Sequence, residues 1–289
     1  MKVVGVAMVR DEDDVIATTL GHHLSIGVDE VLVVDNGSSD GTGRILRSMS
    51  RSTGRVHWTR DDGEYRQSEV TTALAREAVD RGADWIVVLD ADEFWHADGD
   101  LRTRLAACRA DVLRCPVVNF VQERGRRRNA SQGLLRMNHR VERAVGPVDR
   151  TMELVTSSRI GFIEMLYPPK CISRAVPTIE VHPGNHGVSG LDGPQETVED
   201  IACLHAPLRS RADLERKAEQ GVRVARSPAF RPDQGWHVRR WRDLAVDGDL
   251  DAEWAANSYD GAGNLDVYGV TRPLVRDERL ADIARRVGV

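Results

Sequence analysis

Short apolar runs alternate with amphipathic stretches over the first 95 residues. The apolar runs are typical of strands that a parallel sheet buries on both faces, and they lie at residues 3–9, 30–34, 55–59 and 85–89. The stretches between them place apolar side chains on one face of a helix, at residues 15–27, 43–50 and 66–81. This alternation predicts parallel strands joined by right-handed crossovers.

Polar clusters follow each of these four strands, at residues 10–14, 35–42, 60–67 and 90–93. In open α/β sheets, ligands bind outside the carboxyl ends of the strands. Because the carboxyl ends of parallel strands meet at one edge of the sheet, we expect the four clusters to lie side by side. The sequence therefore predicts an α/β domain with a binding site at that edge.

The pattern changes after residue 95. We expect a helix at about 99–109, one strand at 112–121, short strands and loops over 150–190, a strand at 201–206 and a helix at about 211–226. The charged segment 123–131 is typical of an exposed loop. Its arginines at 124–128 fit either a solvated loop or a lid that closes over a ligand.

Charge and composition exclude several classes of function. The formal net charge of −5 gives no positive field toward nucleic acid or an anionic membrane. The chain has no apolar run near the ~18 residues that span a bilayer, and its start lacks the pattern of a signal peptide. The four cysteines lack the CxxC spacing of zinc sites, so we expect reduced thiols in a cytoplasmic protein.

Two carboxylates, Asp90 and Asp92, flank one residue directly after the fourth apolar run. Carboxylates in this position can hold Mg²⁺ or Mn²⁺ and leave coordination positions open for a diphosphate. The cation then neutralises the charge that develops on a departing phosphate. The alternative interpretation is a solvated acidic turn, since aspartate is common in turns.

The cluster after the second strand reads VVDNGSSDGT over residues 33–42. Asp35 or Asn36 can hydrogen-bond a nucleobase edge or a ribose. Ser38, Ser39 and Asp40 can instead cap the helix that follows. Taken alone, this segment favours a turn with a helix cap.

Three ordered blocks together resemble glycosyltransferase family 2, which has the GT-A fold. The blocks are VAMVRDED at 6–13, VVDNGSSDGT at 33–42 and DWIVVLDADEF at 84–94. More narrowly, the chain is similar to a bacterial subgroup with HHxxxGVD at His22–Asp29, DADEFW at 90–95 and HxxxRS at His205–Ser210. The resemblance is strong over 1–95, partial over 165–220 and absent after 228. Ordered blocks that support one another are more specific than any single block.

The resemblance implies a Rossmann-like, mostly parallel central sheet flanked by helices. It implies a GT-A domain over residues 1–227, with a nucleotide-binding half at 1–95 and a half at 96–227 that completes the acceptor and metal sites. A C-terminal helical extension then covers 228–289. The tryptophans of this extension, Trp236, Trp241 and Trp254, can pack over the core or mediate a homodimer.

The implied activity is transfer of a sugar from a nucleotide-sugar, with a UDP-sugar favoured, to a hydroxyl of a small-molecule or glycan acceptor. Mn²⁺ or Mg²⁺ would assist, and the anomeric centre would invert. The resemblance places Asp92 at the metal and in the catalytic centre, and also assigns Asp90 and His205 to the metal. The residues that it implies for nucleotide binding are Val9, Arg10, Glu12, Asp35, Asn36, Arg66, Gln67, Asp90 and Lys170. Asn36 stands where the family commonly has an aspartate that reads uracil, which leaves the base open.

An inverting transfer needs a carboxylate or histidine that deprotonates the acceptor hydroxyl. The candidates are Glu153, Glu164 and Glu180, because the Glu-Asp pair that the family usually carries at a helix start has no match here. Several assignments have structural alternatives. His205 also fits a core position, Arg66 and Lys170 also fit the surface, and the histidines of VHPGNHG (181–187) fit a loop better than a metal pair.

Two other functions share the same sheet and carboxylates. A nucleotidyltransferase usually carries a glycine-rich, basic loop after the first strand, whereas this chain has the acidic VRDEDD at 9–14. A non-catalytic nucleotide-sugar binding protein would not need both Asp90 and Asp92. The sugar, the acceptor and the pathway stay open, since donor pockets differ by one or two hydrogen bonds.

Overall fold

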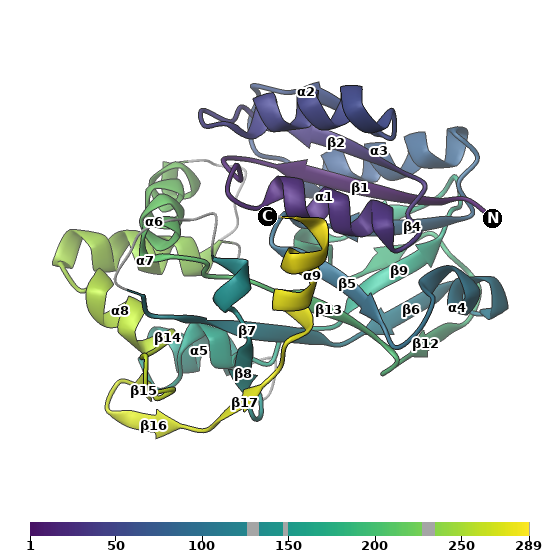
Figure 1. Cartoon of the computed structure of the whole chain (residues 1–289). Coiled ribbons are helices and arrows are strands. Elements are labelled where there is room, and N and C mark those ends of the chain that lie inside the picture. Colours follow the sequence, from purple (N-terminus) through teal and green to yellow (C-terminus); the bar gives the residue numbers. More distant parts are fainter. Residues whose placement is uncertain (126–132, 147–149, 227–234, 289) are drawn as a thin grey trace. The chain divides into compact units, whose positions relative to one another are not determined.

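The computed structural model describes residues 1–125, 133–146, 150–226 and 235–288, which form two compact units (Figure 1). The first unit comprises Met1–Val118 and Pro168–His205, and the second comprises Asn119–Tyr167 and Ala206–Val289. The chain passes from the first unit to the second within strand β7, Val117–Glu123. The predicted boundary at 227/228 touches residues outside the described ranges and stays a prediction.

A seven-stranded mixed sheet forms the centre of the first unit, in the order β12-β6-β9-β4-β1-β2-β3. The four predicted strands form its parallel half: β1 (Val3–Val9), β2 (Glu30–Asp35), β3 (Val56–Arg60) and β4 (Trp85–Leu89). β9 (Lys170–Arg174) runs antiparallel to both β4 and β6, and the remaining members are β6 (Val112–Cys115) and β12 (Gln195–Thr197). The parallel half confirms the α/β prediction, and β9 makes the sheet mixed.

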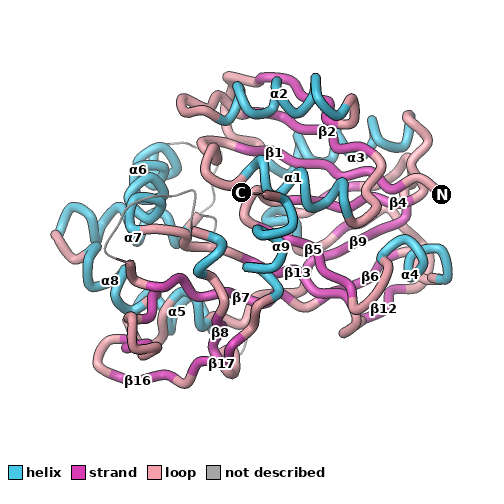
Figure 2. Tube along the Cα trace, viewed as in Figure 1, coloured by secondary structure: helices cyan, strands magenta, loops and turns pink. Residues whose placement is uncertain are grey.

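Helices connect the parallel strands as the amphipathic pattern predicts, and the alternation is visible along the tube in Figure 2. They are α1 (Ile16–Ser25), α2 (Thr42–Thr53) and α3 (Gln67–Asp80), followed by α4 (Leu101–Ala107). Local interactions set where these helices begin and end. Asp100 caps α4 by accepting a hydrogen bond from the amide of Thr103, and Gly54 ends α2 with φ +64°, a conformation that glycine adopts at low cost.

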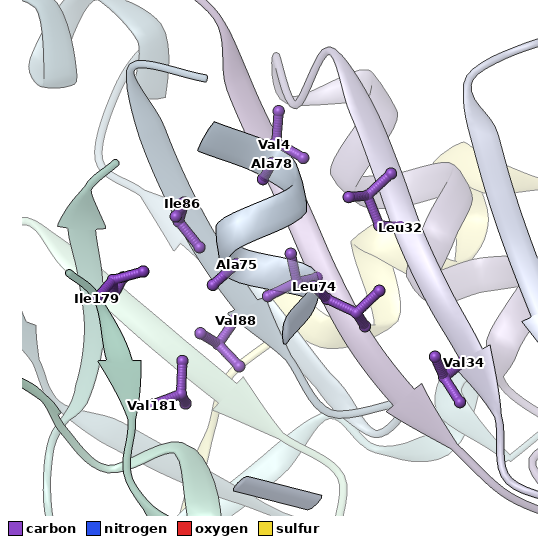
Figure 3. Close-up of a cluster of buried hydrophobic side chains, with 11 residues drawn as sticks. Val4, Leu32, Val34, Leu74, Ala75, Ala78, Ile86, Val88, Ile179 and Val181 are labelled. Atoms are coloured by element: carbon purple, nitrogen blue, oxygen red, sulfur yellow. The ribbon is translucent and has the colours of Figure 1, made fainter. Parts of the chain in front are cut away.

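Helix α3 packs on one face of the sheet through alternate strand positions (Figure 3). Side chains at i and i+2 of a strand share a face, so neighbouring strands contribute pairs to one cluster. The cluster joins Val4, Val6, Leu32, Val34, Ile86 and Val88 of the sheet to Leu74, Ala75 and Ala78 of α3, with Ile179 and Val181 beside them. Truncating one such buried aliphatic side chain to alanine costs roughly 2–5 kcal/mol. This packing fixes α3, and therefore places Gln67, its first residue, at the carboxyl edge of the sheet.

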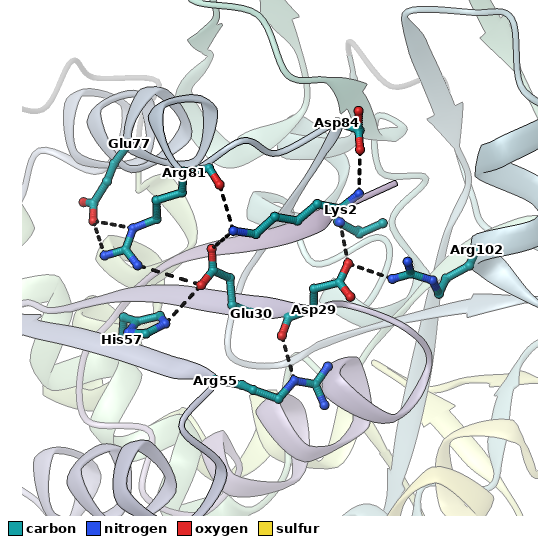
Figure 4. A network of polar contacts seen from close by, with 10 residues as sticks. Lys2, Asp29, Glu30, Arg55, His57, Glu77, Arg81, Asp84 and Arg102 are labelled. Carbon is teal, nitrogen blue, oxygen red and sulfur yellow. Dashed lines mark hydrogen bonds and ion pairs between the residues drawn. The ribbon is translucent and has the colours of Figure 1, made fainter.

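The amino edge of the parallel strands is closed by ion pairs (Figure 4). Lys2 lies 2.7 Å from Glu30 and donates to the carbonyl of Arg81 at 2.8 Å. Asp29 pairs with Arg102 at 2.7 Å and accepts from the amide of Val3. Exposed pairs of this kind contribute ~0–1 kcal/mol each. Each of these charged side chains has a partner of opposite charge, which distinguishes this edge from the carboxyl edge described below.

Three features of the chain between residues 93 and 190 were missed or misjudged from the pattern. The expected strand at 112–121 is two strands, β6 and β7, because Pro116 lacks the amide that would continue the ladder. β5 (Glu93–Ala97) follows β4 after a short turn and pairs antiparallel with β13 (Ile201–His205). The segment 175–190 holds the hairpin β10 (Glu180–Val181) and β11 (Val188–Ser189), with the 3-10 turn η5 (Pro183–Asn185) between them.

The second unit combines the segment before residue 167 with the C-terminal tail. Its strands are β7, β8 (His139–Val141), β14 (Ser258–Tyr259), β15 (Leu265–Val267), β16 (Val270–Arg272) and β17 (Leu274–Arg276). Its helices are α5 (Thr151–Thr156), α6 (Arg211–Arg226), α7 (Trp236–Asp247), α8 (Leu250–Ala256) and α9 (Arg279–Val287), with 3-10 turns η2 (Leu134–Arg136) and η4 (Phe162–Glu164). α5 lies where only short strands and loops were expected.

Aromatic packing holds the second unit together. The rings of Phe162 and Trp241 lie 4.9 Å apart, edge to face, and the indole of Trp241 donates to buried Glu253 at 3.0 Å. The tail therefore packs against the segment around Phe162, while homodimerisation through it stays a prediction. Within the described ranges, no helix has the length and apolarity needed to cross a membrane.

Candidate functional site

The loops that follow β1 and β2 are joined by hydrogen bonds at the carboxyl edge of the sheet. The Asp11 carboxylate accepts from the amide of Ser39 at 2.7 Å, and the Asp13 carboxylate accepts from the amide of Gly41 at 3.1 Å. The loop after β3 joins the same edge, since the amide of Asp61 donates to the carbonyl of Asp35 at 2.9 Å. Three of the four predicted polar clusters thus form one continuous rim.

The predicted residues of the first cluster lie on this rim. Val9 ends β1, and its carbonyl accepts from the amide of Asn36 at 2.8 Å. Arg10 is half-buried, with its Nε 3.6 Å from an oxygen of Asp11. The amide of Glu12 donates to the hydroxyl of Thr42 at 2.8 Å, at the start of α2. The cluster is therefore fixed by its backbone.

Asp35 and Asn36 are buried where β2 ends, with exposures of 0% and 1%. Asp35 Oδ1 accepts from the amide of Ser38 at 2.9 Å, which is the turn that the sequence favours. Asp40 likewise receives the amide of Thr42 at 2.9 Å at the beginning of α2. Asp35 Oδ2 has no hydrogen-bond partner in the described part of the chain, although an Arg60 nitrogen lies 3.8 Å away.

The amide of Asn36 has a fixed orientation. Its Nδ2 donates to the carbonyls of Asp61 at 3.1 Å and Gly63 at 3.3 Å. Because carbonyl oxygens only accept, the nitrogen must face them and the Oδ1 must face away. This Oδ1 is buried and has no hydrogen-bond partner among the residues described. Asn36 therefore fastens the loop after β3 and retains one acceptor.

Asp90 accepts hydrogen bonds from three segments. Its Oδ1 receives the amides of Gln67 at 3.1 Å and Asn185 at 2.8 Å, and its Oδ2 receives the ammonium of Lys170 at 2.7 Å. Asn185 adopts φ +59° directly after Gly184 at +71°. A left-handed conformation is uncommon for asparagine and is worth explaining when it occurs. Here it carries the side-chain amide of Asn185 onto Asp90.

Lys170 is buried, and three acceptors surround its ammonium group. Besides Asp90, these are Glu93 Oε1 at 2.8 Å and the carbonyl of Gly184 at 2.8 Å. Burial alone would lower the pKa of Lys170, but Asp90 and Glu93 outweigh burial and raise it. Burial raises the pKa of Glu93, with Lys170 acting in the opposite direction. Lys170 is thus an interior cation, and a surface position is wrong for it.

Asp92 and His205 meet because β5 and β13 pair. His205 lies opposite Glu93 in that ladder, and its Nε2 is 3.8 Å from Asp92 Oδ1. Mg²⁺ typically takes one or two carboxylates and completes its shell with water and phosphates. A carboxylate and an imidazole at this separation fit two such ligand positions. No cluster of three or more His, Cys, Asp or Glu side chains suited to a metal occurs in the described ranges.

Helix α1 contacts the acidic turn that contains Asp90 and Asp92. The hydroxyl of Thr19 donates to the carbonyl of Ala91, between the two aspartates. His23 Nδ1 donates to the carbonyl of Thr19 at 2.7 Å, and its Nε2 accepts from the amide of Trp95 at 3.2 Å. Burial, with the neighbouring His22, lowers the pKa of His23 well below its usual value. A neutral His23 therefore fixes both sides of the turn.

Three further groups of predicted residues have surroundings of their own. Arg66 is exposed beside Glu69 at 3.3 Å, directly before α3. His186 Nδ1 donates to the carbonyl of Pro168 at 3.0 Å, which favours the loop interpretation over a metal pair with exposed His182. Of the arginines at 124–128, those at 126–128 lie outside the described residues.

The predicted general bases have different environments. Glu164 is 1% exposed, accepts from the amide of Gly161 at 2.7 Å and pairs with Arg272 at 2.6 Å. Glu153 is exposed near the start of α5, 3.5 Å from an Arg150 nitrogen. Both belong to the second unit. Glu180 is exposed on β10 of the first unit. Their roles stay predictions.

Sequence reasoning missed Glu93, Asn185 and the support from α1. Glu93 had a signal, because it is a charged residue at the start of the apolar run Phe94-Trp95. Asn185 had none, since a loop asparagine is ordinary in a Gly/Pro segment. Its importance comes from a contact across 95 positions of the chain.

The chain was compared with known proteins. The family model for Glycosyl transferase family 2 matches residues 9–158, just over half of the chain. Similar solved structures include S. aureus TarS 1-349 in complex with UDP, at 12% identity and TM-score 0.40, covering 86% of this chain and 72% of that chain. Another is the mannosyltransferase PcManGT from Pyrobaculum calidifontis in complex with GDP-Man and Mn²⁺, at 17% identity and TM-score 0.42, covering 87% and 72%.

No curated protein matches the chain. The family match begins at the last residue of β1 and covers β2, β3 and β4, the acidic turn after β4 and the loops of the rim. It agrees with the three sequence blocks and with the sheet that presents them at one edge. The protein belongs to glycosyl transferase family 2, and its mixed sheet flanked by helices is the GT-A fold of that family.

Proposed function

We propose that the protein transfers a sugar from a nucleotide-sugar, with a UDP-sugar favoured, to an acceptor hydroxyl with the help of Mn²⁺ or Mg²⁺. The observation that carries the proposal is a single edge in the first unit that brings together two kinds of group. The Asp92–His205 pair supplies ligands for a hard cation, and buried Asp35 and Asn36 supply unused acceptors. A nucleoside diphosphate needs both.

Asn36 supports a uracil or guanine base. Its nitrogen is occupied by two carbonyls, so only the oxygen can meet a ligand. An acceptor fits the ring N–H of uracil or guanine and opposes the ring nitrogen of cytosine or adenine, which also accepts. Val9, Arg10, Glu12, Asp35 and Arg66 complete the proposed base and ribose surroundings.

Asp92 and His205 would hold the cation through one oxygen and one nitrogen. The cation, when bound, stabilises negative charge on the diphosphate as the sugar–phosphate bond breaks. The protein's own residues would orient the donor and hold it in one position. Asp92 would act at this point as the carboxylate nearest the leaving group.

Inversion requires a general base for the acceptor hydroxyl. Glu153 and Glu180 are better candidates for this base than Glu164, because both oxygens of Glu164 are engaged by Gly161 and Arg272. A small molecule or glycan would be the acceptor. The four buried, unpaired cysteines support a cytoplasmic location.

The test combines binding and product analysis. Melting temperature would be recorded with UDP, GDP, CDP and ADP, with and without Mn²⁺, for the wild type and Asp92→Ala. A ligand at 100 times its Kd stabilises by about 2.7 kcal/mol. We expect a Mn²⁺-dependent shift with UDP or GDP that the variant loses, and contradiction if none of the diphosphates stabilises the wild type. Free sugar plus diphosphate as hydrolysis products would separate a transferase from a nucleotidyltransferase.

A further inference from the structure

Helix α2 carries three arginines on the face that points away from the sheet. Arg44, Arg47 and Arg51 follow one another at intervals of three and four residues, and we call them the arginine row. At roughly 100° and 1.5 Å per residue, they fall within an arc of about 60° and span about 10 Å of the helix axis. The buried residues of α2, Thr42 and Leu46, lie on the opposite side of the helix. All three arginines are exposed.

The arginine row begins close to the carboxyl edge of the sheet. Helix α2 contacts α1 and β3, which is the last strand of the seven-stranded sheet (Figure 1). The first residue of α2, Thr42, accepts a hydrogen bond from the amide of Glu12 in the rim at 2.8 Å. The row starts two residues later. It therefore lies on the outer surface of the first unit, beside the loops of the rim.

The guanidinium groups of the arginine row have no carboxylate partner in the described part of the chain. No acidic residue occurs in the segment 42–55. Helix α4 of the same unit differs in this respect, since its Arg102 lies 2.7 Å from Asp29 and its Arg104 lies 2.7 Å from Asp200. The row is thus a local positive patch whose charges are available to a partner.

The arginine row borders a hollow that is lined by hydrogen-bond donors. The hollow has a volume of about 440 Å³, and its lining residues are Arg44, Arg47, Ser48, Arg51 and Ser52. A guanidinium group only donates, and its planar fork matches the oxygens of a phosphate. Serine hydroxyls donate as well. This surface therefore fits a partner that presents phosphate groups.

The surroundings of the row favour a lipid surface over a protein or a nucleic acid. Helix α2 has no exposed large hydrophobic side chain among the described residues, whereas protein interfaces centre on apolar or aromatic anchors. Proteins that hold nucleic acid through its backbone commonly contact about 6–10 phosphates, which is more than three arginines can reach. A membrane presents many mobile anionic headgroups, so weak contacts of single arginines add up.

The net charge of the whole chain does not prevent such a contact. The chain carries a formal charge of −5, and composition therefore predicts no long-range attraction to an anionic membrane. Charges in water are screened beyond about 8 Å at physiological ionic strength. Because the arginine row spans only about 10 Å, a surface in contact with α2 responds to the row and little to distant carboxylates.

We propose that the arginine row docks the protein on a membrane surface that contains anionic phospholipids. The three guanidinium groups pair with lipid phosphates, and the helix lies along the surface without crossing it. Since α2 begins at the rim, the docked protein holds the carboxyl edge of its sheet close to the membrane. The contact needs neither the sugar donor nor the cation, so it goes beyond the proposed function and is independent of it.

The test is co-sedimentation with phosphatidylcholine vesicles, either alone or with about 30% phosphatidylglycerol. We expect the wild type to bind the anionic vesicles only, and to lose at least about tenfold in affinity between roughly 0.05 M and 0.5 M NaCl. Each arginine should contribute about fivefold, or ~1 kcal/mol. The variant Arg44→Gln/Arg47→Gln/Arg51→Gln should therefore bind about 100-fold more weakly, at the level of the neutral vesicles.

A second triple variant controls for net charge. Arg109→Gln/Arg143→Gln/Arg159→Gln removes three exposed arginines outside α2 and should bind within about twofold of the wild type. Lysine at all three positions of the row keeps the charge and should bind within about threefold. Circular dichroism checks that each variant folds. If the glutamine triple does not, Arg47→Gln alone should still cost about fivefold.

The outcomes decide between the possible partners. Equal binding to neutral and anionic vesicles, or an equal loss in both glutamine triples, would overturn the inference. Tighter binding to duplex DNA than to the anionic vesicles would also overturn it, and so would loss of binding in the lysine triple, which would indicate a defined site for one phosphate. The row variants should keep any Mn²⁺-dependent stabilisation by UDP or GDP, so failure of this inference and failure of the proposed function are distinguishable.

Discussion

Replacing Lys170 with methionine tests whether the interior of the first unit depends on the buried ion pairs. Methionine nearly matches the length of lysine but removes the charge, and it leaves the half-buried Asp90 and the buried Glu93 without their cation. Breaking a buried pair by removing one partner costs about 3–5 kcal/mol, because the remaining charge is uncompensated. Asp90 is 25% exposed and retains Gln67 and Asn185, so we expect the lower end, about 3 kcal/mol.

The assay is urea and thermal unfolding near neutral pH. In the wild type, Asp90 and Glu93 both form an ion pair with Lys170. A loss of 3 kcal/mol lowers Tm by roughly 6–12 °C, at ~2–4 °C per kcal/mol for a chain of this size class. Lys2→Met, with a half-exposed pair, should cost no more than about 1 kcal/mol. Adding Glu93→Gln to Lys170→Met should recover part of the loss. If Lys170→Met and Lys2→Met are equally stable, the reasoning about the buried ion pairs of Lys170 is refuted.

Three further predictions concern the supports of the site. His23→Gln should flatten the pH dependence of unfolding: the pKa of His23 is lowered in the fold, so its contribution is present above about pH 6.5 and lost as pH falls below it, which paired wild-type and variant titrations would reveal. Gly190→Ala should cost ~3 kcal/mol or more, because the added Cβ would lie 1.9 Å from a backbone oxygen, whereas Gly54→Ala meets no atom within 4 Å and should cost about 1 kcal/mol; equal costs in urea unfolding would contradict this. Asn36→Asp should lower stability by about 1–3 kcal/mol and weaken UDP binding, because a carboxylate cannot donate to the carbonyls of Asp61 and Gly63; calorimetry showing unchanged UDP affinity would refute this role of Asn36.

The sequence alone predicted the parallel half of the sheet, the helices that connect it and the family. These follow from local causes: buried strands are apolar on both faces, helices carry a 3.6-residue period, and both signals are read within a few residues. The convergence of the loops after β1, β2 and β3 also followed, because strand polarity fixes which ends share an edge. The resemblance assigned Asp90, Asp92 and His205 to the metal, whereas the pairing of β5 with β13 that brings Asp92 and His205 together is not visible in the sequence.

Tertiary structure decided the contacts that join distant segments. β9 runs antiparallel beside β4, which no local pattern shows, and this placement buries Lys170 under Asp90. The turn η5 brings Asn185 to the same carboxylate across 95 positions. The charge of a lysine and the amide of an asparagine are visible in the sequence, but their partners depend on which strands pair. A hydrogen bond acts only within about 3 Å, so the roles of these residues were set by the fold and not by their order in the chain.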